Sequence, residues 1–126
     1  MTTAVDSPAG RMKLVAGDPC LDFVNTVGGR TPAGPSPGTR VVADKLAGYL
    51  DLVAWGRHSG LLTDAHARRL LREAGQRPRE ATRVFARATA LREALYRSLR
   101  SLTEGARVRP ADLAVLNTEL AAVRRR

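Results

Sequence analysis

The strongest constraint on the fold is a long segment, residues 79–102, in which apolar side chains recur every three or four positions. The apolar positions are Val84, Ala88, Leu91, Leu95, Leu99 and Leu102. This period lines one face of an α-helix, and the segment is far longer than a β-strand. Glu93 and Arg97 are four residues apart and are expected to pair on its exposed side. We therefore predict a long helix that needs other helices to cover its apolar face.

Four further segments carry helix signals. The predicted helices are Pro19–Val27, Val42–His58, Asp64–Ala74 and a last one that starts at Pro110. Asp18 and Thr63 suit helix N-caps, and glycines follow the ends of the first three segments. Residues 11–17 alternate weakly between polar and apolar side chains, as one short extended segment would. The sequence therefore predicts an all-α fold, a single domain of about five helices with room for one short N-terminal extended segment.

Segments without helical periodicity indicate where the predicted domain begins and where it contains a loop. Residues 1–10 are polar and predict a flexible tail, and residues 11–126 predict one helical domain. Within that domain, residues 30–41 form a Gly/Pro-rich segment, which is typical of a loop. A chain of 126 residues is long enough for one domain with a core of its own.

Composition narrows the classes of protein. The chain is 44% hydrophobic and 26% charged, which is typical of a globular protein. A single cysteine excludes an internal disulfide and fits a reducing compartment. Residues 1–10 lack the features of a signal peptide, and no apolar stretch is long enough to span a bilayer. We therefore expect a cytoplasmic protein without a membrane partner.

The first predicted helix contains an unusual set of polar residues. Asp22, Asn25 and Thr26 lie among apolar neighbours, and Arg30 follows shortly after. Polar groups within an apolar helix need hydrogen-bond partners, or they lower stability. The set is therefore either a polar anchor of the structure or the wall of a small effector site, with Tyr49 and Trp55 as its apolar side. Both interpretations stay open at this point.

Residues that often carry catalysis are isolated in this sequence. Cys20 is placed in the first turn of a predicted helix, where the helix dipole lowers the pKa of a thiol, but no histidine is nearby in sequence. His58 and His66 belong to no cluster, so we expect no metal site. The sequence contains no Ser-His-Asp order, phosphate-binding glycine loop or pair of catalytic carboxylates. We expect no catalytic residues and no enzymatic activity.

Positive charge suggests an alternative function. The net charge is +9, and 15 basic against seven acidic residues place +8 of it in residues 61–126. The candidate phosphate-binding residues are Arg72, Arg79, Arg83, Arg87, Arg124, Arg125 and Arg126. An ordinary solvated helix face is the competing explanation. The alternatives to an effector-binding domain are therefore a direct nucleic-acid-binding helical protein and a module that forms a homodimer through its apolar helix faces.

Several landmarks follow one another along the chain in a specific order. They are Leu21-Asp-Phe-Val-Asn-Thr26, Arg30, Tyr49-Leu-Asp-Leu-Val-Ala-Trp55, Gly60-Leu-Leu62, Phe85–Tyr96 and Asp112-Leu-Ala-Val-Leu-Asn117. This ordered set, over about Lys13–Val123, resembles the ABATE family, described as stress-induced transcription regulators of bacteria. The resemblance implies that the chain is the helical, sensory or regulatory part of such a regulator.

Members of that family usually continue into a C-terminal zinc finger named for its Cys-Gly-Asn-Arg motif, to which DNA binding is attributed. In this sequence Cys20 is the only cysteine, and one cysteine with two histidines cannot supply four zinc ligands. The resemblance therefore implies no cofactor in this chain, with zinc expected only in the missing finger. It also implies that DNA contact comes from that finger.

Overall fold

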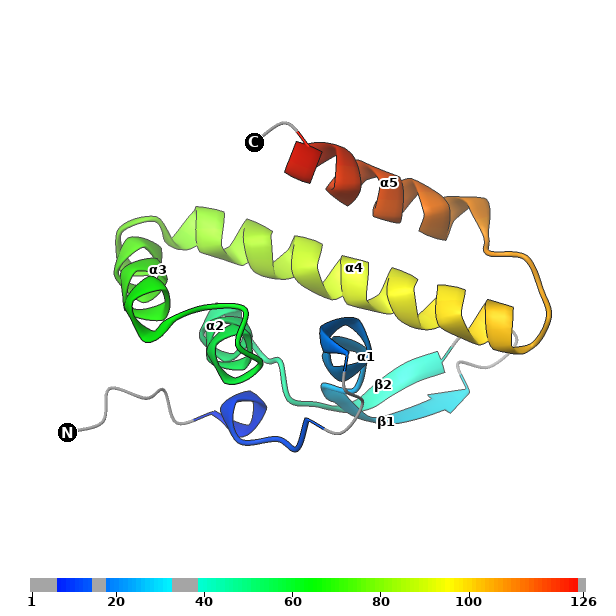
Figure 1. Cartoon of the computed structure of the whole chain (residues 1–126), viewed down its shortest axis with the longest axis horizontal. Helices are drawn as coiled ribbons and strands as arrows, with labels where there is room; N and C mark the ends of the chain where they lie inside the picture. The colour runs from blue at the N-terminus through cyan, green and yellow to red at the C-terminus, as the bar shows by residue number, and fades with distance from the viewer. Residues whose placement is uncertain (1–6, 15–17, 33–38, 125–126) are drawn as a thin grey trace. The chain divides into compact units, whose positions relative to one another are not determined.

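The computed structural model describes residues 7–14, 18–32 and 39–124 (Figure 1). In chain order the elements are the 3-10 helix η1 (Pro8–Gly10), α1 (Pro19–Val24), β1 (Val27–Pro32), β2 (Thr39–Asp44), α2 (Tyr49–His58), α3 (Asp64–Gln76), α4 (Pro78–Thr103) and α5 (Pro110–Arg124). The prediction of a predominantly all-α fold with five helices is confirmed. The chain divides into two compact units, Met1–Phe85 and Ala86–Arg126, and α4 contributes to both.

The first unit is built around α2. Four consecutive residues of this helix, Val53 to Gly56, are buried, and both η1 and α3 pack against it. Trp55 lies against Phe23 of α1, with the ring centroids 5.1 Å apart. Leu46, Ala67 and Ala9 are buried as well. The core of this unit is therefore small and depends on one helix that is covered on several sides.

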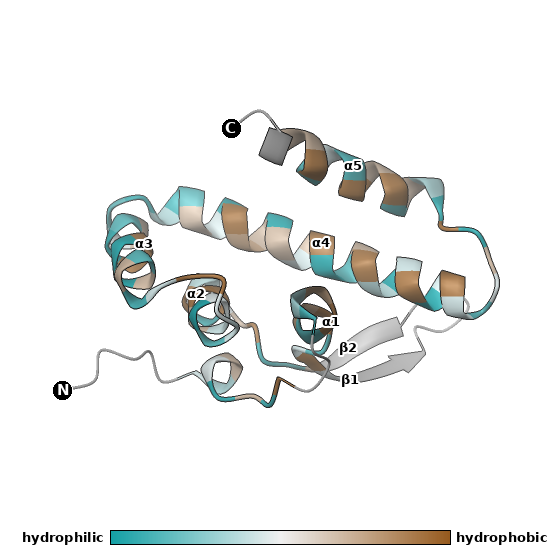
Figure 2. Cartoon of the chain, viewed as in Figure 1, coloured by the Kyte–Doolittle hydropathy of each residue, from teal (hydrophilic) through white to brown (hydrophobic). Residues whose placement is uncertain are grey.

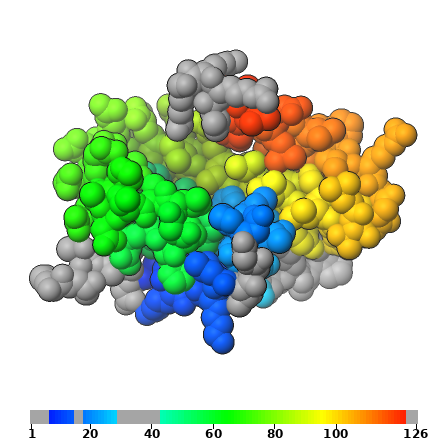
Figure 3. All heavy atoms as spheres, viewed as in Figure 1, coloured from blue at the N-terminus to red at the C-terminus, as the bar shows by residue number. Residues whose placement is uncertain are grey.

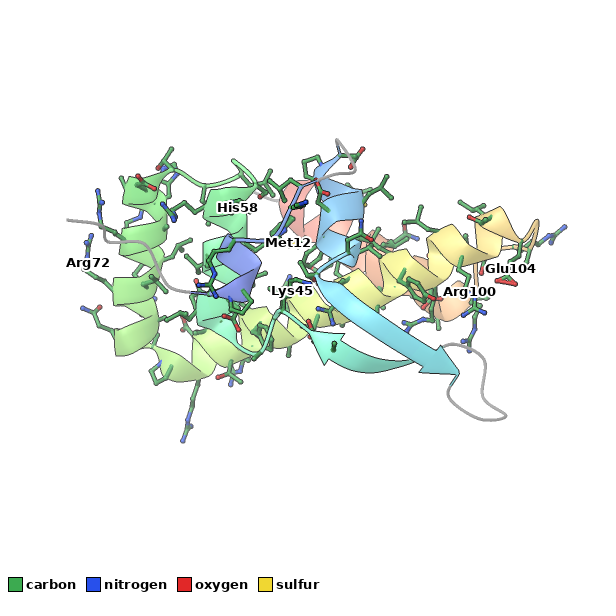
Figure 4. All side chains as sticks on the ribbon, turned by 90° about the horizontal axis from the view of Figure 1, so that it is seen from below. Met12, Lys45, His58, Arg72, Arg100 and Glu104 are labelled. Carbon is green, nitrogen blue, oxygen red and sulfur yellow. The ribbon has the colours of Figure 1, made fainter. Side chains whose placement is uncertain are left out.

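The predicted N-terminal tail is partly wrong, because Ser7–Gly10 are folded. The Ser7 hydroxyl donates a 2.6 Å hydrogen bond to Asp51 at the start of α2, and Ala9 is fully buried. At the other end of α2, His58 Nε2 lies 2.6 Å from the carbonyl oxygen of Met12 and donates to it (Figure 4). Among residues 11–14 of the predicted extended segment no strand is present; residues 15–17 lie outside the described residues.

The predicted loop over residues 30–41 is wrong where the structure describes it, because two strands form a hairpin there. Strand β1 pairs antiparallel with β2 in the register Val27↔Asp44, Gly29↔Ala43, Arg30↔Val41, Thr31↔Arg40 and Pro32↔Thr39. The β-branched residues Thr39, Val41 and Val42 favour an extended chain. Glycines and prolines in the same segment outweighed this signal in the sequence prediction.

Because of the hairpin, two helix boundaries in the structure differ from the predicted ones. Helix α1 ends at Val24, three residues early, because the Thr26 hydroxyl and amide both donate to the Phe23 carbonyl, at 2.7 and 3.1 Å. Helix α2 begins at Tyr49 instead of Val42. Before it, the carboxylates of Asp44 and Asp51 accept the amide hydrogens of Leu46 and Ala47 and turn the chain.

The boundaries of the later helices agree closely with the prediction. Helix α3 runs two residues beyond Ala74, through Gly75, and the proline at the start of α4 limits it. Figure 2 shows brown apolar bands that recur along α4, as the periodicity predicts. Among the described residues, no helix combines the length and apolar character that crossing a bilayer requires.

The second unit is a helical hairpin, in which α5 runs back along α4 (Figure 1). Two ion pairs fix the antiparallel register: Arg87 with Glu119, and Arg97 with Asp112. The predicted pair of Glu93 and Arg97 is wrong. Arg97 binds Asp112 of α5, and Glu93 accepts a 2.9 Å hydrogen bond from Arg92. The Asp112 side chain is 4% exposed, whereas that of Glu93 is 22% exposed and already pairs with Arg92.

Candidate functional site

The six residues predicted for an effector site or polar anchor lie on or next to α1, β1 and α2. Asp22 and Thr26 are buried, with 5% and 0% of their surfaces exposed. Besides the Thr26 hydroxyl bond to Phe23, the Thr26 carbonyl accepts the amide hydrogen of Lys45 at 2.9 Å. These contacts connect the end of α1 to the end of β2. They are the contacts that a structural anchor makes.

Asn25 and Arg30 lie on either side of the start of β1. Asn25 is exposed and caps the C-terminus of α1, where its amide donates to Leu21. The backbone of Arg30 pairs with Val41 in the hairpin, whereas its side chain lies outside what the structure describes. Asn25 was predicted on the first helix and Arg30 after it, but α1 ends at Val24, before Asn25.

Trp55 belongs to the core of the first unit. Its ring is 5% exposed and packs at a tilt of 39° against Phe23. The indole Nε1–H has no hydrogen-bond partner among the described residues. Trp55 therefore acts as a packing residue whose indole donor is unsatisfied among the described residues.

Tyr49, the first residue of α2, lines a hollow of about 180 Å³ in the first unit. We call it the Tyr49 hollow; it is lined by Tyr49, Leu70, Glu73, Ala74, Arg77, Glu80, Ala81 and Val84. Helix α3 and the start of α4 supply four aliphatic side chains to it. Three charged side chains also line it: Glu73 from α3, Glu80 from α4, and Arg77 from between the two helices. Helical spacing explains this convergence, because residues 70, 73, 74 and 77 stand at positions i, i+3, i+4 and i+7, and residues 77, 80, 81 and 84 do the same.

The charged side chains that line the Tyr49 hollow do not balance one another: two are carboxylates and one is a guanidinium. Burial, followed by the negative charge of Glu73, raises the pKa of the Tyr49 phenol. The phenol therefore remains protonated and can donate a hydrogen bond near neutral pH. Arg77 Nη1 lies 3.7 Å from Glu80 Oε2. Glu73 forms no ion pair with another described residue, so the hollow carries one carboxylate more than it has cations.

Sequence reasoning found Tyr49 but missed the other residues of this hollow. Val84 was predicted only as part of the apolar face of the long helix, and Leu70 and Ala74 only as residues of the helix Asp64–Ala74. Glu73 and Arg77 carried no motif. Their joint position beside Tyr49 depends on the packing of α3 against α2, which a single sequence does not specify.

The predicted arginine stripe is interrupted at Arg87. Its guanidinium donates two hydrogen bonds to Glu119 of α5, with Nη2 2.8 Å from Oε1 and Nε 3.2 Å from Oε2. This contact raises the pKa of Arg87 and neutralises its charge locally. The side chain of Arg124, like all of Arg125 and Arg126, lies outside the described residues.

Other arginines have no such partner. Arg72, Arg79 and Arg83 are exposed and form no ion pair with another described residue, and the same holds for Arg69, which the sequence analysis had not selected. Arg72 points outward from α3 (Figure 4). We call these four residues the arginine surface: Arg69, Arg72, Arg79 and Arg83. Its i,i+3 pair on α3 and i,i+4 pair on α4 each share a helix face.

Cys20 and the histidines have ordinary surroundings. Burial, and then the charge of Asp18, raises the pKa of the Cys20 thiol, so the predicted lowering by the helix dipole is wrong. Helix α1 has only six residues, and burial together with the adjacent Asp18 carboxylate outweighs the effect of its small dipole on the thiol pKa. Within the described residues no group of three His, Cys, Asp or Glu side chains is placed to hold a metal ion.

Comparison with known families gives a match over most of the chain. The ABATE family model, described as "Putative stress-induced transcription regulator", matches residues 17–126. That range contains the Tyr49 hollow and the arginine surface. No curated protein and no solved structure matches the chain.

Proposed function

The chain belongs to the ABATE family, and from that membership we propose that it is the sensory and regulatory part of a stress-induced transcription regulator. We propose that it acts in the cytoplasm without catalysing a reaction and that a small effector binds in the Tyr49 hollow. The observation that carries the effector site is the meeting of an apolar floor, a protonated phenol and an unpaired carboxylate in one concave place. Apolar walls with a few convergent polar groups are typical of small-molecule sites.

The lining of the hollow favours a particular ligand chemistry. Leu70, Ala74 and Val84 offer contact to an apolar group, and Glu73 offers a carboxylate to a cation beside the phenol ring. The excess of one carboxylate disfavours an anionic ligand. We therefore propose a small organic ammonium compound with an apolar body as the effector class.

The volume limits the size of the effector. At about 180 Å³ the hollow is smaller than the range of roughly 300–1,000 Å³ found for drug-sized ligands. A single ring with a short charged chain suits this volume better than a nucleotide does. A ligand of this size binds weakly on its own, with a dissociation constant on the order of 1 mM.

Asp22, Thr26 and Trp55 have a supporting role in this proposal. Thr26 joins the end of α1 to Lys45 just after β2, and Trp55 of α2, the helix that begins at Tyr49, packs against Phe23 of α1. Asp22 is buried on the same helix as Phe23. Asn25 and Arg30 are kept outside the proposed effector contacts. A substitution of Thr26 should therefore lower the stability of the protein, and it should weaken effector binding only as a consequence of that lower stability.

The test uses 2-phenylethylamine as the probe and phenylacetate as its charge-reversed counterpart, both followed by NMR titration of the full chain. We expect the amine to shift amide resonances around Tyr49, Glu73 and Arg77, and the acid to shift none of them. Glu73→Gln should weaken amine binding at least fivefold, because it removes the carboxylate and keeps the shape. Glu104→Gln is the matched control, since it removes an exposed carboxylate on the loop between α4 and α5.

Three results would contradict the proposal. Shifts caused equally by amine and acid would show that charge plays no part. Shifts that survive Glu73→Gln unchanged, or that cluster outside the hollow, would place binding elsewhere. A complete absence of shifts at tens of millimolar amine would remove this effector class.

A further inference from the structure

The arginine surface leads to a second inference, which is independent of the effector hollow. Residues 64–84 contain six arginines and three acidic residues. Two of these acids are already paired: Asp64 with Arg57 at 3.0 Å, and Glu80 with Arg77 at 3.7 Å. The third, Glu73, faces Tyr49. The positive charge of Arg69, Arg72, Arg79 and Arg83 is therefore not neutralised by the described carboxylates of this segment.

The form of this region suits an extended anion. Arg79 and Arg83 line a shallow surface depression together with Pro78 and Thr82. The Thr82 hydroxyl donates its hydrogen to the Pro78 carbonyl at 3.0 Å. An anion in this depression would therefore receive its hydrogen bonds from the guanidinium groups. Helix α3 is largely exposed, and its green atoms form part of the outer surface in Figure 3. Arg69 and Arg72 continue the positive charge onto this preceding helix.

We propose that the arginine surface binds the phosphate backbone of duplex DNA. Arginine donates to phosphate oxygens in a fixed fork geometry, and phosphate contacts supply most sequence-independent affinity for DNA. The helical part of the chain then contributes its own contacts to DNA. This contribution is separate from the one that the family resemblance assigns to a zinc finger.

The surroundings favour duplex DNA over two other polyanions. Single-stranded nucleic acids are held by aromatic side chains that stack on bases. All five aromatic residues of this chain are buried or half-buried. Membrane-surface helices insert large apolar side chains beside their basic residues. In α3 the apolar Leu70 and Leu71 are only partly exposed, and Leu70 lines the Tyr49 hollow.

The experiment measures fluorescence anisotropy of a labelled duplex of about two helical turns with the full chain. Each phosphate contact adds about 0.9 to the slope of log affinity against log salt concentration, so four contacts give a slope of about −3.6. Affinity should then fall about 100-fold between roughly 50 and 200 mM salt.

Variants locate the contacts. Arg79→Gln with Arg83→Gln should reduce the slope by about 1.8, and Arg69→Gln with Arg72→Gln should do the same. The matched control is Arg87→Gln with Arg100→Gln. It removes the same two charges from α4, but both of these arginines are already paired, with Glu119 and Glu104 (Figure 4 shows the second pair). The control should change affinity less than twofold.

Circular dichroism of each variant checks that the helices persist. Equal losses in the surface variants and the control would overturn the proposal, because net charge alone would then explain binding. It is also overturned by the absence of duplex binding at low salt. Tighter binding to single-stranded RNA, or to vesicles of anionic phospholipid, than to the duplex would overturn it in favour of that partner.

Discussion

Arg97 of α4 and Asp112 of α5 form an ion pair in which one partner is far more buried than the other. Both Nε and Nη2 of Arg97 lie 2.9 Å from Asp112 Oδ1. The Asp112 side chain is 4% exposed and that of Arg97 is 34% exposed. Asp112 Oδ2 has no hydrogen-bond partner among the described residues. The buried carboxylate therefore depends on a single guanidinium for compensation of its charge.

Loss of Arg97 should be costly for this reason. Arg97→Ala leaves a buried carboxylate without its cation, and we expect the free energy of unfolding to fall by about 2–4 kcal/mol. Arg100→Ala is the control, because it breaks an exposed pair on the same helix, and exposed pairs contribute little. Urea denaturation of both variants measures the difference. Similar losses in the two would show that the burial of Asp112 adds nothing.

Because Trp55 packs against Phe23, the loss of stability should increase with the amount of the Trp55 side chain that a substitution removes. Trp55→Phe keeps an aromatic ring in the core and removes an indole N–H that has no described partner, so we expect a loss of at most about 1.5 kcal/mol. Trp55→Ala removes the ring and should cost about 3–5 kcal/mol. Trp55 is the only tryptophan, so circular dichroism and not fluorescence must follow unfolding. Equal costs for both variants would indicate that the indole N–H forms an essential bond.

Two glycines predict effects of opposite sign. Gly60, after α2, has a φ of +84°, which strains any residue with a Cβ atom, so Gly60→Ala should destabilise the chain by about 1 kcal/mol. Gly75 lies within α3 with open space where a Cβ would stand, so Gly75→Ala should stabilise it by about 0.5–1 kcal/mol. Melting temperatures of both variants test this. Changes of the same sign would be inconsistent with these backbone conformations.

The sequence predicted the long helices well because their evidence is local. Leu91, Leu95 and Leu99 repeat at helical intervals, and Pro78 and Pro110 mark helix starts that the structure confirms. The hairpin was missed because strand pairing between Val27 and Asp44 joins residues 17 positions apart. No local sequence pattern identifies a pairing partner so far along the chain. The prolines between the two strands are also typical of a loop without strands.

Which residues come together in space follows less directly from the sequence than the helices do. The polar residues of the first helix are noticeable in sequence, yet Asp22 and Thr26 are buried, and the hollow forms around Tyr49. Likewise Arg87 has the same spacing as Arg79 and Arg83, but only a tertiary contact reveals its pairing with Glu119. Residue type and spacing thus indicate which side chains are candidates. Which of them converge depends on how the helices pack.

The phenol of Tyr49 should titrate at unusually high pH. Burial, followed by the charge of Glu73, raises its pKa above the value of about 10 of an unperturbed tyrosine. The stabilisation linked to this group is fully present below pH 10 and is lost as the pH rises through the folded-state pKa. Phenolate absorbance, taken as the difference between the wild-type protein and Tyr49→Phe, isolates this group from Tyr96. Glu73→Gln should lower the Tyr49 pKa only in part, because burial is the larger cause, and a titration of Tyr49 at or below pH 10 would contradict its position in the hollow.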